Sequence, residues 1–595
     1  MAETALGKTR EPVGRSDAPS FALSFISYSK SVVMTSGEIV VGIDFGTTFS
    51  GVSWAVNAGT RTVRLINDWP DPISAIANAE KVPSVISYAN GRPDQFGYSV
   101  PIAKESVKWF KLLLDPTHSY ASTEEAIAVQ SRLEKSYQTA EDVAADYLRL
   151  IWEYTKADIC RLKGENWESA YNIKVVLTVP AIWAPAAKDR TERFAKAAGI
   201  PGSIMLVSEP EAAAMAVLKD KDEEEKNLQP GDCFVVCDAG GGTVDLISYK
   251  ILTVDPLRVE ECAVGDGELC GSVFLDMAFE KHIKTVVGDE QYAKLKDRAK
   301  KKMIKEFETG VKCSYTGEEK EYFVDLSGVE DNPEYHINDE TITLKSNMVR
   351  TIFDHIIGKI LILVDNQIDE VRAKDLTVKA ILLVGGFGAN KYLYTRLTDA
   401  HQNDGVKVLQ VNGARSSICR GATLWGLDSS RRPNDIIMPR MVSARLARYS
   451  YGICWDRTFD STRHRLEDRV VRLDGAVRAR NQMEWLIKKG DKIEENQIIS
   501  LNICNIIQGV GFKSAMMSSV SDFAQQLYYC AADVPPPRNG INVKQLCAVS
   551  YGIEHSKLRK ETKRTGIEKV KFRKPTFELQ ILPGSATIKF TVLYK

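Results

Sequence analysis

Apolar and polar positions alternate in two ways between Glu38 and Gly426. Short apolar runs that predict strands are followed by segments of helical periodicity, an order typical of α/β layers. The clearest predicted strands are Ile39–Asp44, Lys174–Val179, Cys233–Asp238 and Ala380–Val384. The clearest predicted helices are Glu141–Cys160, Ala186–Ala198 and Asn347–Ile368.

Changes in this pattern predict the boundaries of the structural units. Residues 1–36 lack periodicity and are predicted to be a disordered extension, in which Met34 is an alternative to Met1 as the translation start. The charged run DKDEEEK (220–226), followed by QPGD, predicts an exposed turn between units 37–230 and 231–427. After DSSRRPNDIIMP (428–439), short strands dominate, so residues 428–595 are expected to form a β-rich domain. Its last segment, FELQILPGSATIKFTVLYK, predicts a hairpin that turns at Pro583-Gly584.

Composition narrows the function classes without selecting one. Lysine plus arginine equals aspartate plus glutamate at 78 each, so net charge gives no drive toward nucleic acid or anionic membrane. The eleven cysteines are scattered, and we interpret Cys233 and Cys237 as reduced core residues rather than zinc ligands or a disulfide, which indicates a reducing compartment. No apolar run is long enough to span a bilayer. The lysine- and arginine-rich segment 555–574 is interpreted as a solvated face, with a phosphate- or lipid-contacting patch as the minority alternative.

One motif occurs twice. The segments VGIDFGTTFSGV (Val41–Val52) and VVCDAGGGTVDLI (Val235–Ile247) each contain a strand ending in an aspartate, then glycines and hydroxyls, then a second strand. Glycines allow a tight turn whose N–H groups can approach an anion. A Rossmann phosphate loop requires a helix after its glycines, and no P-loop sequence is present, so both of those nucleotide folds are excluded.

A single glycine hairpin is most simply a tight β-turn, but two matching copies have a further use. A phosphate chain held between them would receive backbone donors from both sides, while Asp44 and Asp238 hold Mg²⁺ against the phosphate charge. The paired motifs therefore predict a phosphate-binding site.

These segments resemble the phosphate motifs of the actin-like ATPase superfamily, most closely those of the seventy-kilodalton heat-shock chaperones. The resemblance extends to LTVPAIWAPAAKDRTERFAKAAGI (177–200), SEPEAAAMAV (208–217) and ILLVGGFGANKYL (381–393), and covers roughly residues 38–427. SYGICWDRTF (450–459) and EWLIKKGDKI (484–493) are similar to the divergent branch named as member twelve of that family, whose relatives include many fungal proteins.

The resemblance implies an α/β, two-lobed actin-like ATPase (ribonuclease H-like) fold that binds ATP or ADP with Mg²⁺ between its lobes. Asp44 and Asp238 would hold the metal through waters, and Glu209, Asp245 and Thr243 would join Asp238 around the attacking water. For Glu209, a helix N-terminal charge is the simpler alternative. The residues implied to contact nucleotide are Gly46, Thr47, Thr48, Gly240, Gly241, Gly242, Thr243, Gly385, Gly386 and Lys312.

The sequence also departs from the family pattern. Alignment of QFGYSVPIAKES (95–106) places Pro101 where the chaperones have a catalytic lysine, with Lys104 as a substitute. Loss of one donor to transition-state charge typically costs ~10²–10³ in rate, so ATP binding is a stronger prediction than fast hydrolysis. The chaperones' apolar acidic linker and terminal EEVD are missing, and the C-terminal part does not show their β-sandwich followed by a helical lid.

The leading hypothesis is a cytoplasmic (alternatively also nuclear) ATP-binding, heat-shock-70-like protein. It would be a slow, weak ATPase that couples nucleotide state to a chaperone-like interaction with a protein client or co-chaperone, without nucleic acid or a membrane span. A nucleotide-sensing scaffold with negligible turnover is the alternative. A small-molecule kinase of the sugar kinase class is a weaker alternative, because no general-base signature for a sugar substrate is present. An actin-like filament is also a weaker alternative.

Overall fold

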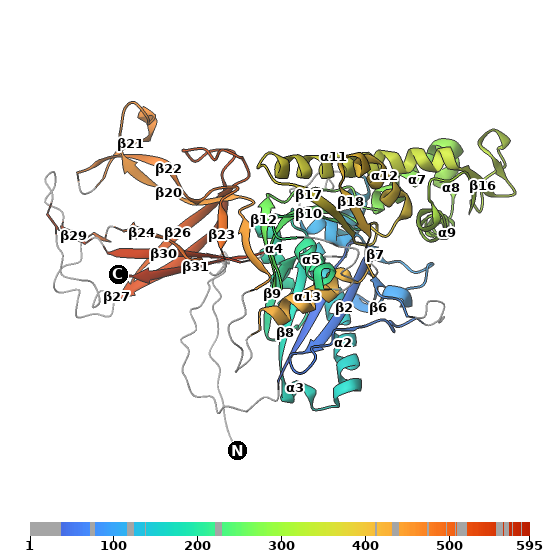
Figure 1. Cartoon of the computed structure of the whole chain (residues 1–595), viewed down its shortest axis with the longest axis horizontal. Coiled ribbons are helices and arrows are strands. Elements are labelled where there is room, and N and C mark those ends of the chain that lie inside the picture. The colour runs from blue at the N-terminus through green and yellow to red at the C-terminus, as the bar shows by residue number, and fades with distance from the viewer. Residues whose placement is uncertain are drawn as a thin grey trace, which may run out of the picture.

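The computed structural model describes most of the chain. The described residues are 37–71, 78–115, 124–136, 138–219, 229–410, 413–430, 440–472, 475–494, 497–505, 507–508, 520–554, 563–564, 571–573, 575–584 and 586–595. The predicted disordered segment 1–36 with Met34, the predicted turn at 220–226 and most of the basic segment 555–574 lie outside them. Figure 1 shows an α/β region, and beside it a β-rich region that contains the C-terminus.

The first large sheet has the strand order β3-β2-β1-β8-β9, with β4 paired to β2. β1 and β2 form the first glycine hairpin, and β8 and β9 continue the sheet in parallel with β1. β5, β6 and β7 form a small sheet nearby. The bounds are β1 (Gly37–Asp44), β2 (Phe49–Val56), β3 (Arg64–Leu65), β4 (Val82–Pro83), β5 (Val85–Ala89), β6 (Arg92–Phe96), β7 (Val107–Lys108), β8 (Tyr171–Val179) and β9 (Ser203–Ser208).

The second large sheet repeats this arrangement. β10 and β11 form the second glycine hairpin, and β17 and β18 continue the sheet in parallel with β10. β12, β19 and β23 extend it beyond β11, while β14, β15 and β16 form a separate small sheet. The bounds are β10 (Cys233–Ala239), β11 (Val244–Val254), β12 (Leu257–Ala263), β13 (Gly267–Glu268), β14 (Glu321–Asp325), β15 (Ile337–Asn338), β16 (Thr341–Lys345), β17 (Val378–Val384), β18 (Lys407–Gln410), β19 (Val442–Leu446) and β23 (Lys492–Glu494).

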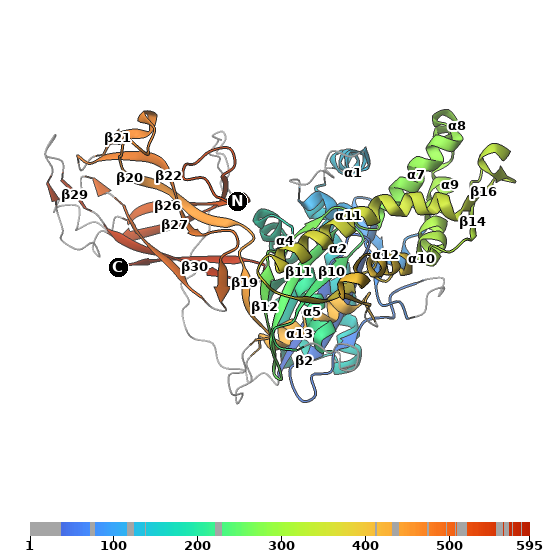
Figure 2. The same ribbon diagram turned by 45° about the horizontal axis from the view of Figure 1, so that its top comes forward.

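Helices α5 and α13 join the two sheets. Their apolar side chains share one core cluster with residues of both sheets, including Val40, Val176, Phe234 and Val236. The helices touch closely, because a Cβ at Gly421 of α13 would lie 1.6 Å from the carbonyl oxygen of Ala212 in α5. In Figure 2, α5 and α13 lie next to β10 and β2.

The other helices cover the outer faces. Side chains of α2 and α4 pack in the core of the first sheet, and those of α7 and α11 pack in the core of the second. The helices are η1 (Gly97–Ser99), η2 (Phe110–Leu114), α1 (Glu124–Lys135), α2 (Ala140–Lys163), α3 (Trp167–Ala170), α4 (Pro185–Ala197), α5 (Glu209–Lys219), α7 (Val273–Val287), α8 (Asp289–Lys294), α9 (Asp297–Glu306), η4 (Phe307–Val311), α10 (Lys312–Ser314), η5 (Pro333–Tyr335), α11 (Ser346–Arg372), α12 (Lys391–His401), η6 (Gln402–Asp404), α13 (Ser417–Asp428) and η7 (Leu466–Asp468).

The C-terminal region contains two sheets that share a core. One has the order β21-β22-β20-β26-β27 and the other β24-β30-β31, and Ile453 and Leu527 of the first pack with Phe577 and Leu579 of the second. The bounds are β20 (Ser450–Thr458), β21 (Arg469–Val471), β22 (Val477–Ile487), β24 (Ile499–Cys504), β25 (Ile507–Gln508), β26 (Val520–Cys530), β27 (Lys544–Glu554), β28 (Lys563–Arg564), β29 (Lys571–Arg573), β30 (Thr576–Pro583) and β31 (Ile588–Tyr594).

The sequence predictions of individual elements are confirmed, but the picture of the C-terminal region needs correction. All four strands and all three helices selected from the periodicity are present, and β30 and β31 form the predicted final hairpin. Short strands such as β21, β25 and β28 are frequent there, as expected. However, β22, β26 and β27 are 11 residues long each, and the two packed sheets form a β-sandwich that the sequence did not predict. Among the described residues, no helix is long and apolar enough to cross a membrane.

The C-terminal region is tied directly to the second large sheet. β19 pairs with β12 and β23 pairs with β19, although both lie beyond the predicted boundary at residue 428.

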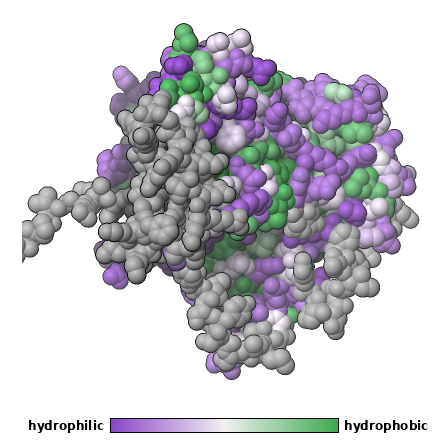
Figure 3. Space-filling model, turned by 90° about the vertical axis from the view of Figure 1, so that its left-hand side faces the viewer, coloured by the Kyte–Doolittle hydropathy of each residue, from purple (hydrophilic) through white to green (hydrophobic). Residues whose placement is uncertain are grey.

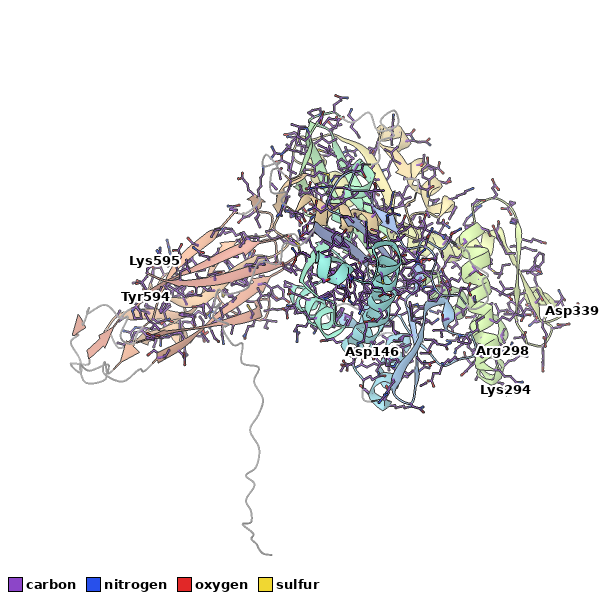
Figure 4. All side chains as sticks on the ribbon, turned by 90° about the horizontal axis from the view of Figure 1, so that it is seen from below. Asp146, Lys294, Arg298, Asp339, Tyr594 and Lys595 are labelled. Atoms are coloured by element: carbon purple, nitrogen blue, oxygen red, sulfur yellow. The ribbon has the colours of Figure 1, made fainter. Side chains whose placement is uncertain are left out.

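The rest of the C-terminal region extends away from the α/β region. Figure 4 shows Tyr594 and Lys595 at one end of the molecule and Lys294, Arg298 and Asp339 at the other. In Figure 3, which looks onto the C-terminal end, hydrophobic and hydrophilic residues are mixed.

Candidate functional site

The first glycine hairpin turns immediately after Asp44, the last residue of β1. Two carbonyl groups of the turn are engaged from outside: Gly46 O accepts the Ser84 hydroxyl at 2.7 Å, and Thr48 O accepts Ser84 N–H at 2.8 Å. In a trans peptide, the C=O of one residue and the N–H of the next point in opposite directions. The N–H of Thr47 therefore points away from Ser84.

The second turn is anchored in the same way by the start of α7. The carbonyl oxygens of Gly240, Gly241 and Gly242 accept backbone N–H groups of Ser272 (3.1 Å), Val273 (2.9 Å) and Gly271 (3.1 Å). By the same peptide geometry, the N–H groups of Gly241, Gly242 and Thr243 point away from α7. Three successive N–H groups on one side of a turn form a concave site suited to an anion.

The two turns face each other in direct contact. A Cβ at Gly241 would lie 2.1 Å from Thr48 Oγ1, and one at Gly242 would lie 2.5 Å from Thr47 Oγ1. Neither position leaves space for a side chain. The structure thus brings the predicted residues of the two hairpins together, although they are far apart in the sequence.

Buried carboxyl groups surround this contact. Asp238 is 2% exposed, and burial and repulsion from Glu209, Asp245 and Asp44 raise its pKa well above the ordinary value. Burial also raises the pKa of Asp245, although its carboxylate accepts the N–H of Ile182 at 3.0 Å. The close carboxyl groups at the ends of β1 and β10 therefore disfavour each other's ionisation.

Glu209 belongs to this group. It is the first residue of α5, in agreement with the simpler alternative, but its side chain is buried and its carboxylate binds Lys111. Burial raises the pKa of Glu209 to about 7, with contributions from Asp245 and Asp44, while Lys111 lowers it.

Sequence reasoning missed two lysines that bind these carboxylates, Lys111, which is buried, and Lys81, which is partly buried. Lys111 of η2 donates to Glu209 Oε1 at 2.6 Å and lies near the rings of Phe45 and Trp183, at 5.6 and 5.5 Å. Lys81 donates to Asp44 Oδ2 at 2.5 Å. Burial disfavours the Lys81 charge, but attraction and hydrogen bonding from Asp44, together with attraction from Asp238, outweigh it and raise the pKa of Lys81.

One signal in the sequence could have identified Lys111. It interrupts the apolar run FKLLL, and a lysine inside such a run is typically paired when buried. Lys81, in EKVPS, has no such signal.

The positions suggested by alignment for the catalytic lysine lie elsewhere. Pro101 is exposed, and Lys104 donates to Asp94 and, at 2.9 Å, to Gln95 Oε1. Lys104 is thus engaged in the small sheet that contains β6, whereas Lys111 reaches Glu209.

Of the residues expected at the adenosine end of the site, Gly385 and Gly386 lie as expected, whereas Lys312 does not. Gly385, with a φ of +88°, packs against the second hairpin, since a Cβ there would lie 2.4 Å from Asp238 Oδ1. A Cβ at Gly386 would meet nothing within 4 Å, so space remains there. Lys312 does not point a free ammonium group toward this space, because its Nζ binds both carboxylate oxygens of Asp276 at 2.7 and 2.8 Å.

A divalent cation at this site would need water to complete its coordination. Among the described residues, no three histidine, cysteine or acidic side chains converge to hold a metal directly. Asp238 Oδ1 is nevertheless buried without a hydrogen-bond partner, which disfavours an isolated carboxylate and suits a cation. Asp44 differs, because Lys81 already binds its Oδ2 atom and Thr178 donates to Oδ1 at 3.4 Å.

The site is connected to the C-terminal region through α5. Glu211, two residues after Glu209, is 1% exposed and accepts a two-pronged ion pair from Arg445 of β19, with an Nε–Oε2 distance of 3.1 Å. Trp425 Nε1 of α13 donates to the same carboxylate at 2.8 Å. One helix start therefore carries both the Glu209 site contact and the tie to β19.

Comparisons with known proteins relate the part of the chain that contains the second hairpin to a known family. Residues 116–401 match the family model described as Hsp70 protein, and residues 445–595 match a model described as Domain of unknown function (DUF8568). The chain is 22% identical to heat shock 70 kDa protein 12A of Homo sapiens over 504 residues, which cover 70% of this chain and 72% of that protein.

Further relatives can be aligned with smaller parts of this chain. Heat shock 70 kDa protein 12B of Homo sapiens is 22% identical over 320 residues, covering 44% of this chain and 46% of that protein. Chaperone protein DnaK of Mycoplasmoides gallisepticum is 26% identical over 352 residues, covering 58% and 53%.

The raised pKa of Glu209 predicts a pH-dependent stability. A carboxyl group whose pKa rises on folding stabilises the folded state fully below its unfolded pKa, and this contribution is lost as pH rises through the folded value of about 7. Between about pH 4.5 and about pH 7, the unfolding free energy of the wild type should therefore fall. In Glu209→Gln this fall should be smaller by on the order of 2 kcal/mol, because the titrating carboxyl group is absent. Urea unfolding of metal-free protein across this range measures it. An unchanged pH profile in Glu209→Gln, or the same change in surface Glu192→Gln, would contradict the assignment.

Proposed function

Since residues 116–401 form an Hsp70-family domain in a chain homologous to the heat shock 70 kDa proteins 12A and 12B, we propose that this protein binds ATP between two lobes and hydrolyses it slowly. The facing turns are the main support. Each turn has its carbonyl groups engaged from outside, so its N–H groups remain available for phosphate. The nearby carboxylates give the site an affinity for the cations that accompany nucleotides.

The hairpin residues have defined parts in this proposal. Gly46, Thr47 and Thr48 hold the phosphates from one side, and the turn from Gly240 to Thr243 holds them from the other. Bound Mg²⁺ would neutralise phosphate charge and would be held through water by Asp238 and Asp44. Glu209 and Asp245 orient the attacking water, and at neutral pH the partly protonated Glu209 can accept or return a proton.

We assign the missing catalytic lysine to Lys111. Its ammonium group lies 2.6 Å from Glu209 and also attracts Asp245, so it adjoins the residues that orient the attacking water. Leu112, the next residue, reaches the second turn, because a Cβ at Gly242 would lie 2.8 Å from Leu112 Cδ2. η2 thus holds a cation beside the phosphate-binding turn and supports turnover despite Pro101.

Gly385 and Gly386 support the adenosine end, between β17 and α12. The open space at Gly386 can receive the nucleoside, and Gly385 holds β17 against Asp238. Lys312 acts indirectly in this arrangement: its ion pair with Asp276 joins α10 to α7, and its carbonyl accepts Asn390 Nδ2 at 3.0 Å. It therefore positions the start of α12, where Asn390 is the N-cap residue.

The biological output we propose is a chaperone-like protein interaction controlled by nucleotide. ATP and ADP would favour different lobe angles, and β19 would transmit the angle to the C-terminal sandwich, which would contact a client or co-chaperone. The Arg445–Glu211 ion pair, beside Glu209, supports this path. The eleven cysteines are all free, which suits a reducing compartment such as the cytoplasm. A scaffold that binds ATP without turnover is the alternative, favoured by Pro101.

The first prediction concerns ATP binding by the full chain. Gly241→Ala places a Cβ 2.1 Å from Thr48 Oγ1 and 2.9 Å from Thr48 Cβ, so the turns must separate. Calorimetry with Mg²⁺-ATP should show binding by the wild type, weakened ~10-fold or more in this variant, because a displaced turn loses charge-assisted hydrogen bonds. Gly358→Ala in α11, where a Cβ meets nothing within 4 Å, is the matched control and should bind normally. Absence of ATP binding by folded wild-type protein would refute the proposed function.

The second prediction concerns hydrolysis. Lys111→Met should lower the single-turnover rate by ~10²–10³, with a much smaller change in ATP affinity, because the lysine acts on charge that develops in the transition state. Lys111→Arg should recover part of the rate. Lys104→Met, which removes the lysine suggested by alignment, should leave the rate unchanged. The assignment is wrong if Lys104→Met is the slow variant, and the scaffold is favoured if wild-type protein binds ATP without turnover.

The third prediction concerns coupling. Hydrogen exchange of β20 and β22 should differ between the ATP and ADP states of the wild type, and the difference should disappear in the Glu211→Gln/Arg445→Met double variant. Both partners are changed because a single change would leave a buried charge unpaired, at a cost of ~3–5 kcal/mol. Arg457→Met, which breaks an ion pair within the C-terminal region, is the control that should retain the difference. Identical exchange of wild type in both states would exclude coupling.

A further inference from the structure

Lys81 binds Asp44, one of the two aspartates expected to hold a metal ion. It immediately precedes β4, and the pairing of β4 with β2 brings it to the first hairpin. Its Nζ atom is 2.5 Å from Asp44 Oδ2, and the two side chains are 13% and 2% exposed. The site therefore already contains a cation of its own at one of its two expected metal-holding carboxylates.

The Lys81 side chain is held from several directions. Its aliphatic part packs on the hairpin, since a Cβ at Gly51 would lie 3.2 Å from Lys81 Cγ. Its backbone carbonyl accepts the hydroxyl of Tyr98 at 3.0 Å, and Val82 beside it is completely buried. The ammonium group is thus a fixed part of the site, in contrast to a long surface side chain that would have to be ordered on binding.

Its surroundings suit a phosphate ligand. An ammonium group has three N–H donors, of which the contact to Asp44 uses one. The Lys81 charge also attracts Asp238 on the opposite hairpin, whose Oδ1 atom has no partner. Lys81 therefore lies within the charge distribution of both aspartates.

We propose that Lys81 is a resident cation of the nucleotide site, which lets the site bind a nucleoside triphosphate without a divalent metal. This inference rests on the proposed function. The ammonium group binds phosphate oxygen while it neutralises Asp44, two tasks otherwise left to Mg²⁺. A metal held at Asp238 then adds to binding but is not required for it.

The test measures ATP affinity by calorimetry on the full chain, in Mg²⁺ and in excess EDTA. Removal of metal should weaken wild-type binding by less than ~10-fold, whereas Lys81→Met should lose a further ~10²-fold or more in EDTA, as one charge-assisted contact and one neutralising charge are removed. Lys81→Arg should behave as the wild type. If Lys81→Met folds poorly, the double variant Asp44→Asn/Lys81→Met replaces it, because this variant leaves no unpaired carboxylate. It should show the metal dependence expected for Lys81→Met.

Lys312→Met is the matched control, because Lys312 is also a largely buried lysine paired with an aspartate. It can lower affinity, but its ratio of affinities in Mg²⁺ and EDTA should equal that of the wild type. The inference is overturned if wild-type binding falls ~10²-fold or more in EDTA, or if binding by Lys81→Met is as insensitive to metal as that of the wild type. If folded protein binds no ATP even in Mg²⁺, the proposed function itself fails, an outcome distinct from the two others.

Discussion

Repulsion among buried carboxylates at the meeting point of the two glycine hairpins is the constraint on which the rest of the structure depends. Asp44, Asp238, Asp245 and Glu209 are each at most 6% exposed. In a poorly polarisable interior such charges repel far more strongly than in water, and an unpaired one is costly. The lysines that offset this charge come from outside the hairpins, so their segments must stay close to the site.

This requirement explains the arrangement of otherwise unremarkable segments. η2 has no sheet partner, yet its Lys111 is bound to Glu209 and its Leu112 reaches the second hairpin. The short strand β4 is fixed to β2 by pairing, and Lys81 just before it binds Asp44. Each lysine thus couples the position of a peripheral segment to the charge state of the site. Any ligand that changes that charge changes what holds these segments in place.

The hairpins, the principal strands and the long helices could be predicted from the sequence because their signals are local. Glycine turns, apolar runs and helical periodicity all lie within short windows. Lys111 and Lys81 could not be placed, because their partners are 98 and 37 residues away and no spacing rule links them. Lys312 shows the same limit: its ion pair with Asp276, 36 residues earlier, takes the ammonium group that the family resemblance directed to adenine.

The C-terminal sandwich could not be predicted from the sequence for a related reason. Its strands alternate as expected, but strand partners can be distant, as when β24 pairs with β30, from Ile499 with Ile581 to Cys504 with Thr576. Local patterns predict that strands exist and leave open which strands pair, so they cannot separate a sandwich from a set of hairpins. The final hairpin was predicted correctly because β30 and β31 are joined by one short turn.

The attachment of the sandwich determines what motion it can follow. Only Ala447, Arg448 and Tyr449 separate β19, a strand of the second large sheet, from β20, a strand of the sandwich. So short a connection makes the sandwich follow the edge of that sheet.

The C-terminal region contacts the first large sheet through side chains, in contrast to its direct chain connection with the second. Tyr449 donates to the carbonyl of Ile182 at 3.4 Å, in the segment after β8, and the N–H of Ile182 binds Asp245 at 3.0 Å. The C-terminal region is therefore fixed to one sheet by strand pairing. It is linked to the other by this long hydrogen bond, which adjoins the carboxylate site, and by Ala586, which packs against the core of the first sheet. A relative shift of the two sheets would strain the Tyr449 and Ala586 contacts before it disturbed the β12–β19 pairing, so the first response of the C-terminal region should occur at these two residues.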